Sequence, residues 1–308
     1  MVLQRVVVGV DFSAPSEAAV RWVARELAPT ADVVLVHAVD VPAPPSFLRS
    51  RFPSRDTLAG TARAGADASL RELGAILGPE RSHLELRDGR ADEAIAAVAA
   101  AYHADLVVLG AGGDTSALHA LGTTAERVAR TAPAPVLLAR QPLAARGATV
   151  LVAMDDDGLT PALQQWTTFL AAQFDAAVTG LHVVSETMLG RLVSLAAVVA
   201  GTPEPPALGV GVVEDANVWM RELVAKGLDS TRTRGEVAYG DPAREILATA
   251  ERLSATVIVL GRHRATGVRR QLLGSVADRV VRGASCSVLV VTEPAIDAAS
   301  VGQERPAA

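Results

Sequence analysis

A glycine-rich turn followed by hydroxyl residues is the feature of this chain best suited to bind an anion. Gly110 and Gly113 lie in the turn, and after eight intervening residues the chain reads Gly122, Thr123 and Thr124 before a helical pattern. Glycines let backbone N–H groups approach phosphate oxygens, and the N–H groups and hydroxyls at a helix start can complete the site. The pattern predicts a phosphate-binding turn that needs no lysine. The alternative is a turn that only reverses the chain.

A related pattern occurs in the second half of the chain. Gly261 is followed by Arg264 and, after nine intervening residues, by Gly274 and Ser275. Arg264 stands where the first pattern has a glycine, so its side chain would either fill the phosphate space or bind phosphate oxygens with its guanidinium. We favour the steric interpretation. The arginines that could help in the second case are Arg262, Arg269 and Arg270.

Both patterns belong to a repeat that runs through the chain. Four apolar blocks of the first half recur in the same order in the second half, at separations of about 145 to 152 residues. Chance similarity would rarely keep this order, so the chain is interpreted as a duplication. The paired blocks are 6–13 with 150–157, 33–40 with 178–185, 105–113 with 256–264, and 134–140 with 286–292.

Each copy alternates β-branched runs with helical patterns, which predicts an α/β domain with a five-stranded parallel sheet between helices. In the first copy, Ser16 is the expected N-cap of one helix, and another helix is expected from Asp92. Strands are expected near 6–10, 32–38, 82–87, 105–110 and 135–139. In the second copy, helices are expected near 160–173, 214–227, 242–253 and 273–282.

The expected domains are residues 1–141 and 148–293, with a linker at 141–148 and a disordered tail at 294–308. The last strand of each copy, near 135–139 and 287–291, is apolar and would otherwise be an exposed sheet edge. We therefore expect the two copies to pack about a pseudo-twofold axis through these strands.

The glycine spacing closely resembles the Gly-x2-Gly-x9-Gly-Ser/Thr nucleotide motif of the universal stress protein family. VVVGVDFS, LVHAVD, DLVVLGAGG and APAPVLLAR are similar to the family's other signatures, in order. The resemblance covers nearly the whole chain twice and implies two tandem Rossmann-like domains of the adenine nucleotide alpha hydrolase-like type. The first copy departs from the pattern because its intervening stretch is one residue shorter.

The resemblance implies that the first copy binds ATP, alone or with Mg²⁺, between its first and fourth strands. The residues implied for this site are Val10, Asp11, Ala38, Leu109, Gly110, Gly113, Gly122, Thr123 and Thr124. The matching positions of the second copy form a weaker candidate. They are Met154, Asp155, Val183, Leu260, Gly261, Arg264, Gly274, Ser275 and Val276. The acidic run 155–157 would repel a bare triphosphate unless magnesium intervenes, and we favour a solvated loop there.

Composition narrows the function classes. A net charge of -5 and a pI near 5.7 argue against nucleic acid and anionic membranes as partners. The apolar stretch 188–201 is too short to cross a membrane. Cys286 is the only cysteine and the start lacks a signal-peptide pattern, so a reducing cytoplasm is expected. Lys226 is the only lysine and lies far from any glycine-rich turn, which excludes a Walker P-loop.

Other reactive residue types are given structural interpretations. His37 and His182 occupy matching positions and are expected to pack or hydrogen-bond, since neither has a metal-ligand spacing to a second ligand. Cys286 opens the last strand and is expected to be an unreactive core residue. No catalytic residue and no metal site is assigned.

Three functions remain open from the sequence. The leading hypothesis, supplied by the family resemblance, is a nucleotide-responsive regulatory module of the stress response, read by an unknown protein partner or a second subunit. An enzyme is disfavoured because the chain lacks a Ser-Gly-Gly-x-Asp-Ser loop and a His-x-Gly-His pair, which leaves slow ATP hydrolysis at most. A dimerisation module with vestigial sites is the third. Any further association is expected to be a homodimer of tandem chains.

Overall fold

The computed structural model describes residues 1–42, 53–111, 123–140, 147–154, 160–185, 211–227, 232–262 and 273–292, together with Pro45, Phe47, Arg51 and Gly190. Domain 1 contains β1 (Arg5–Gly9), α1 (Ala14–Trp22), the π-helical turn η1 (Val23–Leu27), β2 (Asp32–Val39), α2 (Arg55–Gly74), β3 (Ser82–Asp88), α3 (Ala91–Ala101), β4 (Leu106–Gly110), α4 (Thr123–Thr131) and β5 (Val136–Ala139). Domain 2 contains β6 (Thr149–Met154), α5 (Pro161–Gln173), β7 (Ala177–Ser185), α7 (Gly211–Gly227), β8 (Thr233–Gly240), α8 (Pro242–Arg252), β9 (Val257–Gly261), α9 (Ser275–Gly283) and β10 (Ser287–Val291).

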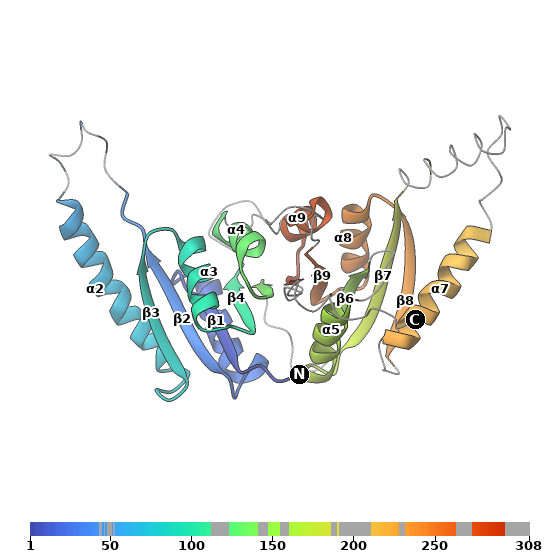
Figure 1. The fold of residues 1–308 in the computed structure, drawn as a ribbon, viewed down its shortest axis with the longest axis horizontal. Helices are drawn as coiled ribbons and strands as arrows, with labels where there is room; N and C mark the ends of the chain where they lie inside the picture. The colour runs from blue at the N-terminus through green and yellow to red at the C-terminus, as the bar shows by residue number, and fades with distance from the viewer. Residues whose placement is uncertain are drawn as a thin grey trace, which may run out of the picture.

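The ten strands form one sheet in the order β3-β2-β1-β4-β5-β10-β9-β6-β7-β8. Strands are parallel within each domain, and the pair β5 and β10 is antiparallel. Figure 1 shows domain 1 on the left and domain 2 on the right, with α2 and α7 at the two outer ends. The predicted fold class, two tandem five-stranded α/β domains, is confirmed.

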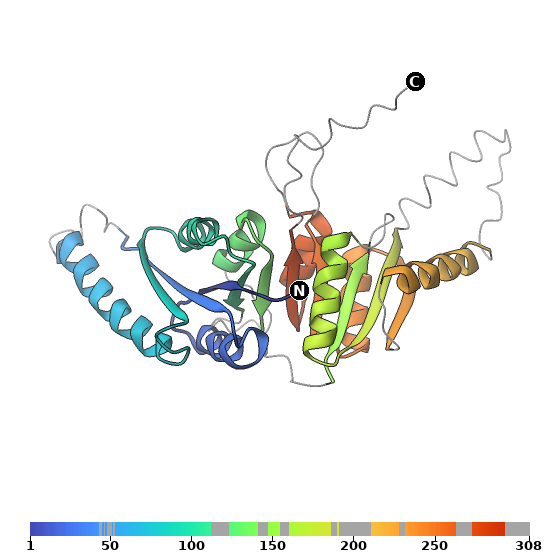
Figure 2. The same cartoon turned by 60° about the horizontal axis from the view of Figure 1, so that its bottom comes forward.

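Helices cover both faces of the sheet, which explains why its inner strands, such as β1 and β4, read as apolar runs. Along β1, Val6 and Val8 pack on the layer that contains α1, α2, α5 and α7, whereas Val7 packs on the layer that contains α3, α4, α8 and α9. In Figure 2 the dark blue α1 and the teal α3 lie on opposite sides of the sheet. The alternation follows the two-residue period of a strand.

The two domains join through their last strands. Val136, Leu137 and Leu138 of β5 lie opposite Val290, Leu289 and Val288 of β10, and all six side chains are buried. Because equivalent positions of the two copies face one another, the pairing has the geometry of a pseudo-twofold axis. The predicted packing through the last strands is confirmed.

Contacts on both faces of the sheet strengthen this junction. On one face, the ring of Trp22 stacks on Phe174 at a centroid distance of 5.8 Å, and the Gln173 side chain donates a hydrogen bond to the Glu26 carbonyl at 2.6 Å. On the other face, α4 and α9 lie side by side at the centre of Figure 1. The junction therefore has apolar and polar components.

The two open edges of the sheet carry charged side chains. Glu85 and Arg87 form an ion pair on β3, and Arg234 and Glu236 form one on β8. Charges on edge strands oppose edge-to-edge association. The residues at risk of aggregation, the apolar last strands, are instead covered by each other.

Two helix starts differ from the sequence-based prediction. Helix α1 is capped by Ser13, whose hydroxyl accepts a hydrogen bond from the Ser16 backbone, and Ser16 itself is buried in the first turn. Helix α3 begins at Ala91, and Asp92 lies in its first turn beside Arg90 rather than acting as the cap. Helix α2, which the sequence analysis did not assign, packs along β2 and β3.

Three predicted segments lie outside the described residues. They are the tail, the segment 188–201 except Gly190, and positions 141–146 of the linker.

Candidate functional site

The order of the strands reverses between β1 and β4, because β2 follows on one side of β1 and β4 lies on the other. At the carboxyl ends, Gly9 of β1 pairs with Leu109 of β4, and the Val10 backbone donates to the Val36 carbonyl of β2 at 2.8 Å. The structure therefore brings the ends of three strands together. Four predicted site residues lie at these ends: Val10, Ala38, Leu109 and Gly110.

Asp11 follows β1 directly and is fixed by the start of α1. Its Oδ1 accepts hydrogen bonds from the Ser13 N–H at 3.0 Å and the Ser13 hydroxyl at 2.5 Å. Partial burial acts to raise the pKa of Asp11, but the hydrogen bonds from Ser13 and Ser16 outweigh it and hold the pKa below its usual value. Both hydrogen bonds from Ser13 go to Oδ1, which leaves Oδ2 as the oxygen that can accept a hydrogen bond from a ligand.

Phe12 and His37 close one side of these strand ends. The backbone of Phe12 has φ of 61°, a left-handed conformation that is rare for a large side chain. Its ring lies 4.5 Å from that of His37, and Nδ1 of His37 is 2.7 Å from the Val10 carbonyl oxygen. These contacts confirm the packing and hydrogen-bonding interpretation of His37. The half-buried Ala38 comes next on the strand.

Gly110 lies where β4 passes the start of α1. A Cβ atom built on Gly110 would come within 2.5 Å of the Pro15 carbonyl carbon and of the Ser16 nitrogen. Only glycine permits this approach, so Gly110 has a packing role besides the predicted one under a nucleotide. Leu109 is buried against α3 and β1, and its side chain would meet a Cβ placed on Gly9.

Helix α4 supplies the hydroxyl residues of the predicted phosphate turn. Thr123 and Thr124 are its first two residues, Thr123 exposed and Thr124 half-buried. The first N–H groups of a helix have no intrahelical acceptor and favour an anion. Gly113 and Gly122 lie outside the described residues, so the geometry of the turn itself stays a prediction.

At the corresponding strand ends of domain 2, a buried Met154 stands in place of Val10, and His182 is more buried than His37. Met154 is buried at the end of β6, and its carbonyl oxygen lies 3.2 Å from Nδ1 of the buried His182. The Trp219 ring of α7 packs edge-on against His182 at 5.0 Å. These contacts confirm that His182 packs and hydrogen-bonds. The other described positions are Val183 on β7, Leu260 and Gly261 at the end of β9, Gly274 as N-cap of α9, and Ser275 and Val276 in its first turn.

Arg262 does not belong to the second nucleotide site as the sequence analysis had allowed. Its guanidinium crosses the domain junction, donating from Nη1 to the carbonyls of Ala129 and Arg130 and from Nη2 to that of Ala132. Its side chain is only 5 % exposed. The helper role toward phosphates is therefore wrong for Arg262. The positions Asp155, Asp156, Asp157, Arg264, Arg269 and Arg270 lie outside the described residues.

Comparison with known proteins identifies the family. The sequence profile of the universal stress protein family matches residues 3–140 and again 148–292. The chain belongs to the universal stress protein family. It is 27 % identical to universal stress protein YxiE of Bacillus subtilis over 150 residues, which cover 46 % of this chain and 97 % of that protein.

One further relative and two solved structures are also similar to this chain. A universal stress protein of Methanocaldococcus jannaschii is 51 % identical over 59 residues, 19 % of this chain and 35 % of that protein, so this chain spans about a third of that relative. Among solved structures, a universal stress protein of Archaeoglobus fulgidus aligns with a TM-score of 0.64 at 17 % identity, covering 94 % of this chain and 98 % of the other. A Pseudomonas aeruginosa structure gives 0.62 at 15 % identity, covering 95 % and 94 %. The structures share the tandem fold.

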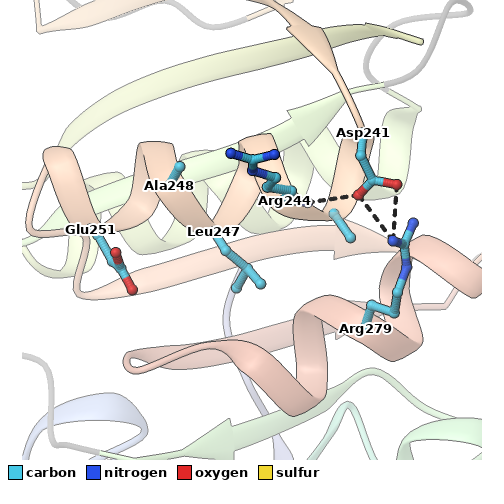
Figure 3. Close-up of a pocket in the computed structure, with 7 residues that line it drawn as sticks. Asp241, Arg244, Leu247, Ala248, Glu251 and Arg279 are labelled. Carbon is cyan, nitrogen blue, oxygen red and sulfur yellow. Dashed lines mark hydrogen bonds and ion pairs between the residues drawn. The ribbon is translucent and has the colours of Figure 1, made fainter. Parts of the chain in front are cut away.

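This universal stress protein also has an open groove between α8 and α9 that the sequence analysis missed (Figure 3). Asp241, the N-cap of α8, accepts hydrogen bonds from the Arg244 backbone at 3.0 Å and from Nη1 of Arg279 at 2.9 Å. These two contacts, the backbone bond first, lower the pKa of Asp241. The aspartate before Pro242 was a readable cap signal. The lining residues are Asp241, Ala243, Arg244, Leu247, Ala248, Glu251 and Arg279.

Within the described residues, no group of three or more His, Cys, Asp and Glu side chains is placed to hold a metal ion. None of the helices in that part of the chain is long and apolar enough to cross a membrane.

Cys286 is half-buried, and burial raises the pKa of its thiol, so the reactive thiolate is scarce at neutral pH.

Proposed function

We propose that this chain is an ATP-binding universal stress protein in which domain 1 is a nucleotide-responsive regulatory module. The observation that carries the proposal is the reversal of strand order between β1 and β4. Open α/β sheets bind ligands at such a point, beyond the carboxyl ends of the strands. Of the residues that the family resemblance implies for the nucleotide, Val10 follows β1, and Leu109 and Gly110 end β4.

The described residues include groups that can bind the ribose and the phosphates of ATP. Oδ2 of Asp11 can accept hydrogen bonds from ribose hydroxyls, and the lowered pKa of Asp11 agrees with an ionised acceptor. The first N–H groups of α4 and the hydroxyls of Thr123 and Thr124 can donate to phosphate oxygens. Gly113 and Gly122 would complete the phosphate turn, and Mg²⁺ would offset the charge of the triphosphate.

Domain 2 is the weaker candidate in this proposal. Met154 and His182 fill the strand ends, and Trp219 covers His182 from α7. The sequence adds Arg264 in place of the glycine that domain 1 has at position 113. We therefore expect one ATP per chain.

Two measurements test the proposal. Mass spectrometry of the denatured, freshly purified protein should detect co-purified adenine nucleotide, and calorimetric titration with ATP and magnesium should give about one site per chain. Gly113→Arg should weaken binding roughly ten- to a hundredfold, because each lost charge-assisted hydrogen bond is worth about 1.5 to 3 kcal/mol. Arg264→Gly should raise the number of sites toward two. A protein that binds no adenine nucleotide would instead favour the dimerisation module with vestigial sites.

We also propose a reducing cytoplasmic location, in line with the single cysteine, and association as a homodimer of tandem chains. Such a homodimer must use a surface other than β5 and β10, because these strands pair with each other inside the chain. Light scattering that gives the mass of one chain at working concentration would argue against it.

A further inference from the structure

Arg262 of domain 2 holds the C-terminal end of α4, the helix whose N-terminal end lies at the proposed nucleotide site of domain 1. Its backbone is fixed first, because the Arg262 N–H donates to the Val291 carbonyl of β10 at 2.9 Å. Its guanidinium then reaches three carbonyls at and just after the end of α4, at 2.9 to 3.2 Å. We propose that Arg262 is a positioning residue for the ATP site of domain 1, which makes nucleotide affinity depend on the domain junction.

The last carbonyls of a helix have no intrahelical partner, and burying them without one is costly. A planar guanidinium can satisfy several of them at once, and its positive charge suits the negative end of the helix dipole. The carbonyl of Ala132 is reached from a residue more than a hundred positions away, and Ala132 is fully buried. Domain 2 therefore supplies the C-terminal cap that α4 does not provide for itself.

Helix α4 depends on this cap because its own packing is small. It has nine residues, and those it buries are Ala125, Val128 and Ala129. A helix of this length spans about 13 Å and moves as one body, so a shift at the capped end also displaces Thr123 and Thr124. Phosphate binding needs donors within hydrogen-bond distance, so it is sensitive to such a shift.

The arrangement is not symmetrical between the domains. The position of domain 1 that corresponds to Arg262 is Ala111, which has no side chain able to reach α9. Domain 1 instead sends Arg140, from the end of β5, to the Val281 carbonyl of α9 at 3.0 Å. Arg140 therefore crosses the same junction toward the weaker candidate site, and it serves as a matched control.

The test compares full-length Arg262→Met and Arg140→Met by calorimetric titration with Mg·ATP, with urea unfolding of each variant alongside. This proposal rests on ATP binding in domain 1, so wild-type protein is titrated first, and failure to bind ATP there would remove the proposed function itself. If wild type binds, Arg262→Met should bind about fivefold or more weakly with unchanged stoichiometry. Arg140→Met should stay within about twofold of wild type. Wild-type affinity in a folded Arg262→Met variant would overturn the inference.

Two measurements separate positioning from a general loss of stability. Arg262→Lys keeps the charge but loses the guanidinium fork, so its affinity should be lower than that of wild type. This comparison does not need a folded Arg262→Met variant. In wild-type protein, ATP should slow hydrogen exchange in the C-terminal turn of α4 as well as its first turn, because coupling of binding free energies is reciprocal. Protection confined to the first turn, together with wild-type affinity of Arg262→Lys, would contradict the proposal.

Discussion

Leu137 of β5 and Leu289 of β10 lie directly opposite each other, and they are equivalent residues of the two copies. Each is 1 % exposed. The same separation of 152 residues relates Glu126 to Asp278 on the neighbouring helices. An isologous contact repeats each interaction about its axis, and here the two halves of that contact lie in one chain.

The buried pair of Leu137 and Leu289 should not tolerate a charged side chain. Leu137→Asp would bury a carboxylate between two domains without a partner, so we expect the free energy of unfolding to fall by at least about 3 kcal/mol. Leu84→Asp on the edge strand β3, where the side chain is 39 % exposed, should cost less than about 1 kcal/mol. Urea unfolding followed by circular dichroism measures both. Equal losses would mean that the junction contributes no more than an edge.

The helix pair α4 and α9 carries two equivalent ion pairs, Arg130 with Asp278 and Arg282 with Glu126. Double-mutant cycles with Arg130→Met and Asp278→Asn, and with Arg282→Met and Glu126→Gln, should each give a coupling of about 0.5 to 1 kcal/mol. Raising the salt concentration should reduce both couplings, since the arginines are partly exposed. A coupling in only one cycle would show that the symmetry of positions does not extend to energies.

Asp92 should make stability depend on acid pH. The carboxylate is largely buried, which alone would raise its pKa, but the hydrogen bond and charge of Arg90, 2.8 Å away, hold the pKa below its usual value. A lowered folded-state pKa means that the contribution is present above the unfolded value of about 3.9 and is lost as pH falls through the folded value. Asp92→Asn should therefore lose about 1 kcal/mol at pH 6 and clearly less at pH 2.

The matched control for this prediction is Glu93→Gln, because Glu93 also pairs with Arg90 but is exposed. Its substitution should change stability little at either pH. Urea unfolding of both variants at the two pH values gives the comparison. A loss in Asp92→Asn that is the same at pH 6 and pH 2 would assign the effect to shape rather than charge.

Sequence patterns predicted the features of the fold that follow from hydrophobic periodicity and from the internal repeat. The four apolar blocks that recur gave the duplication, and the apolar character of the last strands gave their pairing. What they missed depends on contacts across the sequence. Arg262 lies next to a glycine-rich turn, and nothing local indicates that its guanidinium binds carbonyls of the other domain. Ser16 and Ser13 are both good caps, and the buried position of Ser16 decided between them.

The candidate site also combines residues that the sequence indicated with contacts that it could not show. Val10, Asp11, Leu109 and Gly110 were implied by the family resemblance, and the strand order brings together the strand ends next to which they lie. The spacing of residues could not show that Gly110 also meets the backbone of α1, because that contact joins segments about a hundred residues apart. Nor could it show that Met154 and Trp219 fill the second domain's strand ends, since α7 lies far along the chain.

The two strand-end glycines, Gly110 and Gly261, should respond very differently to one added methyl group. In Gly110→Ala the methyl group would lie within 2.6 Å of three backbone atoms of Pro15 and Ser16, and backbone cannot rotate away as a side chain can. The start of α1 must then move, and with it the Ser13 contacts that orient Asp11. We expect a loss of about 2 kcal/mol or more in stability, together with weaker ATP binding.

Gly261→Ala is the control at the equivalent position of domain 2. Within the described part of the chain, its methyl group would meet only the Leu163 side chain, at 3.6 Å, which is ordinary contact. Stability should therefore change by less than about 0.5 kcal/mol, and ATP binding in domain 1 should be unaffected. Thermal unfolding and calorimetric titration of both variants measure these effects. If Gly110→Ala matches Gly261→Ala in stability, α1 can shift freely; if it loses stability but keeps its ATP affinity, Asp11 does not contribute to the nucleotide site.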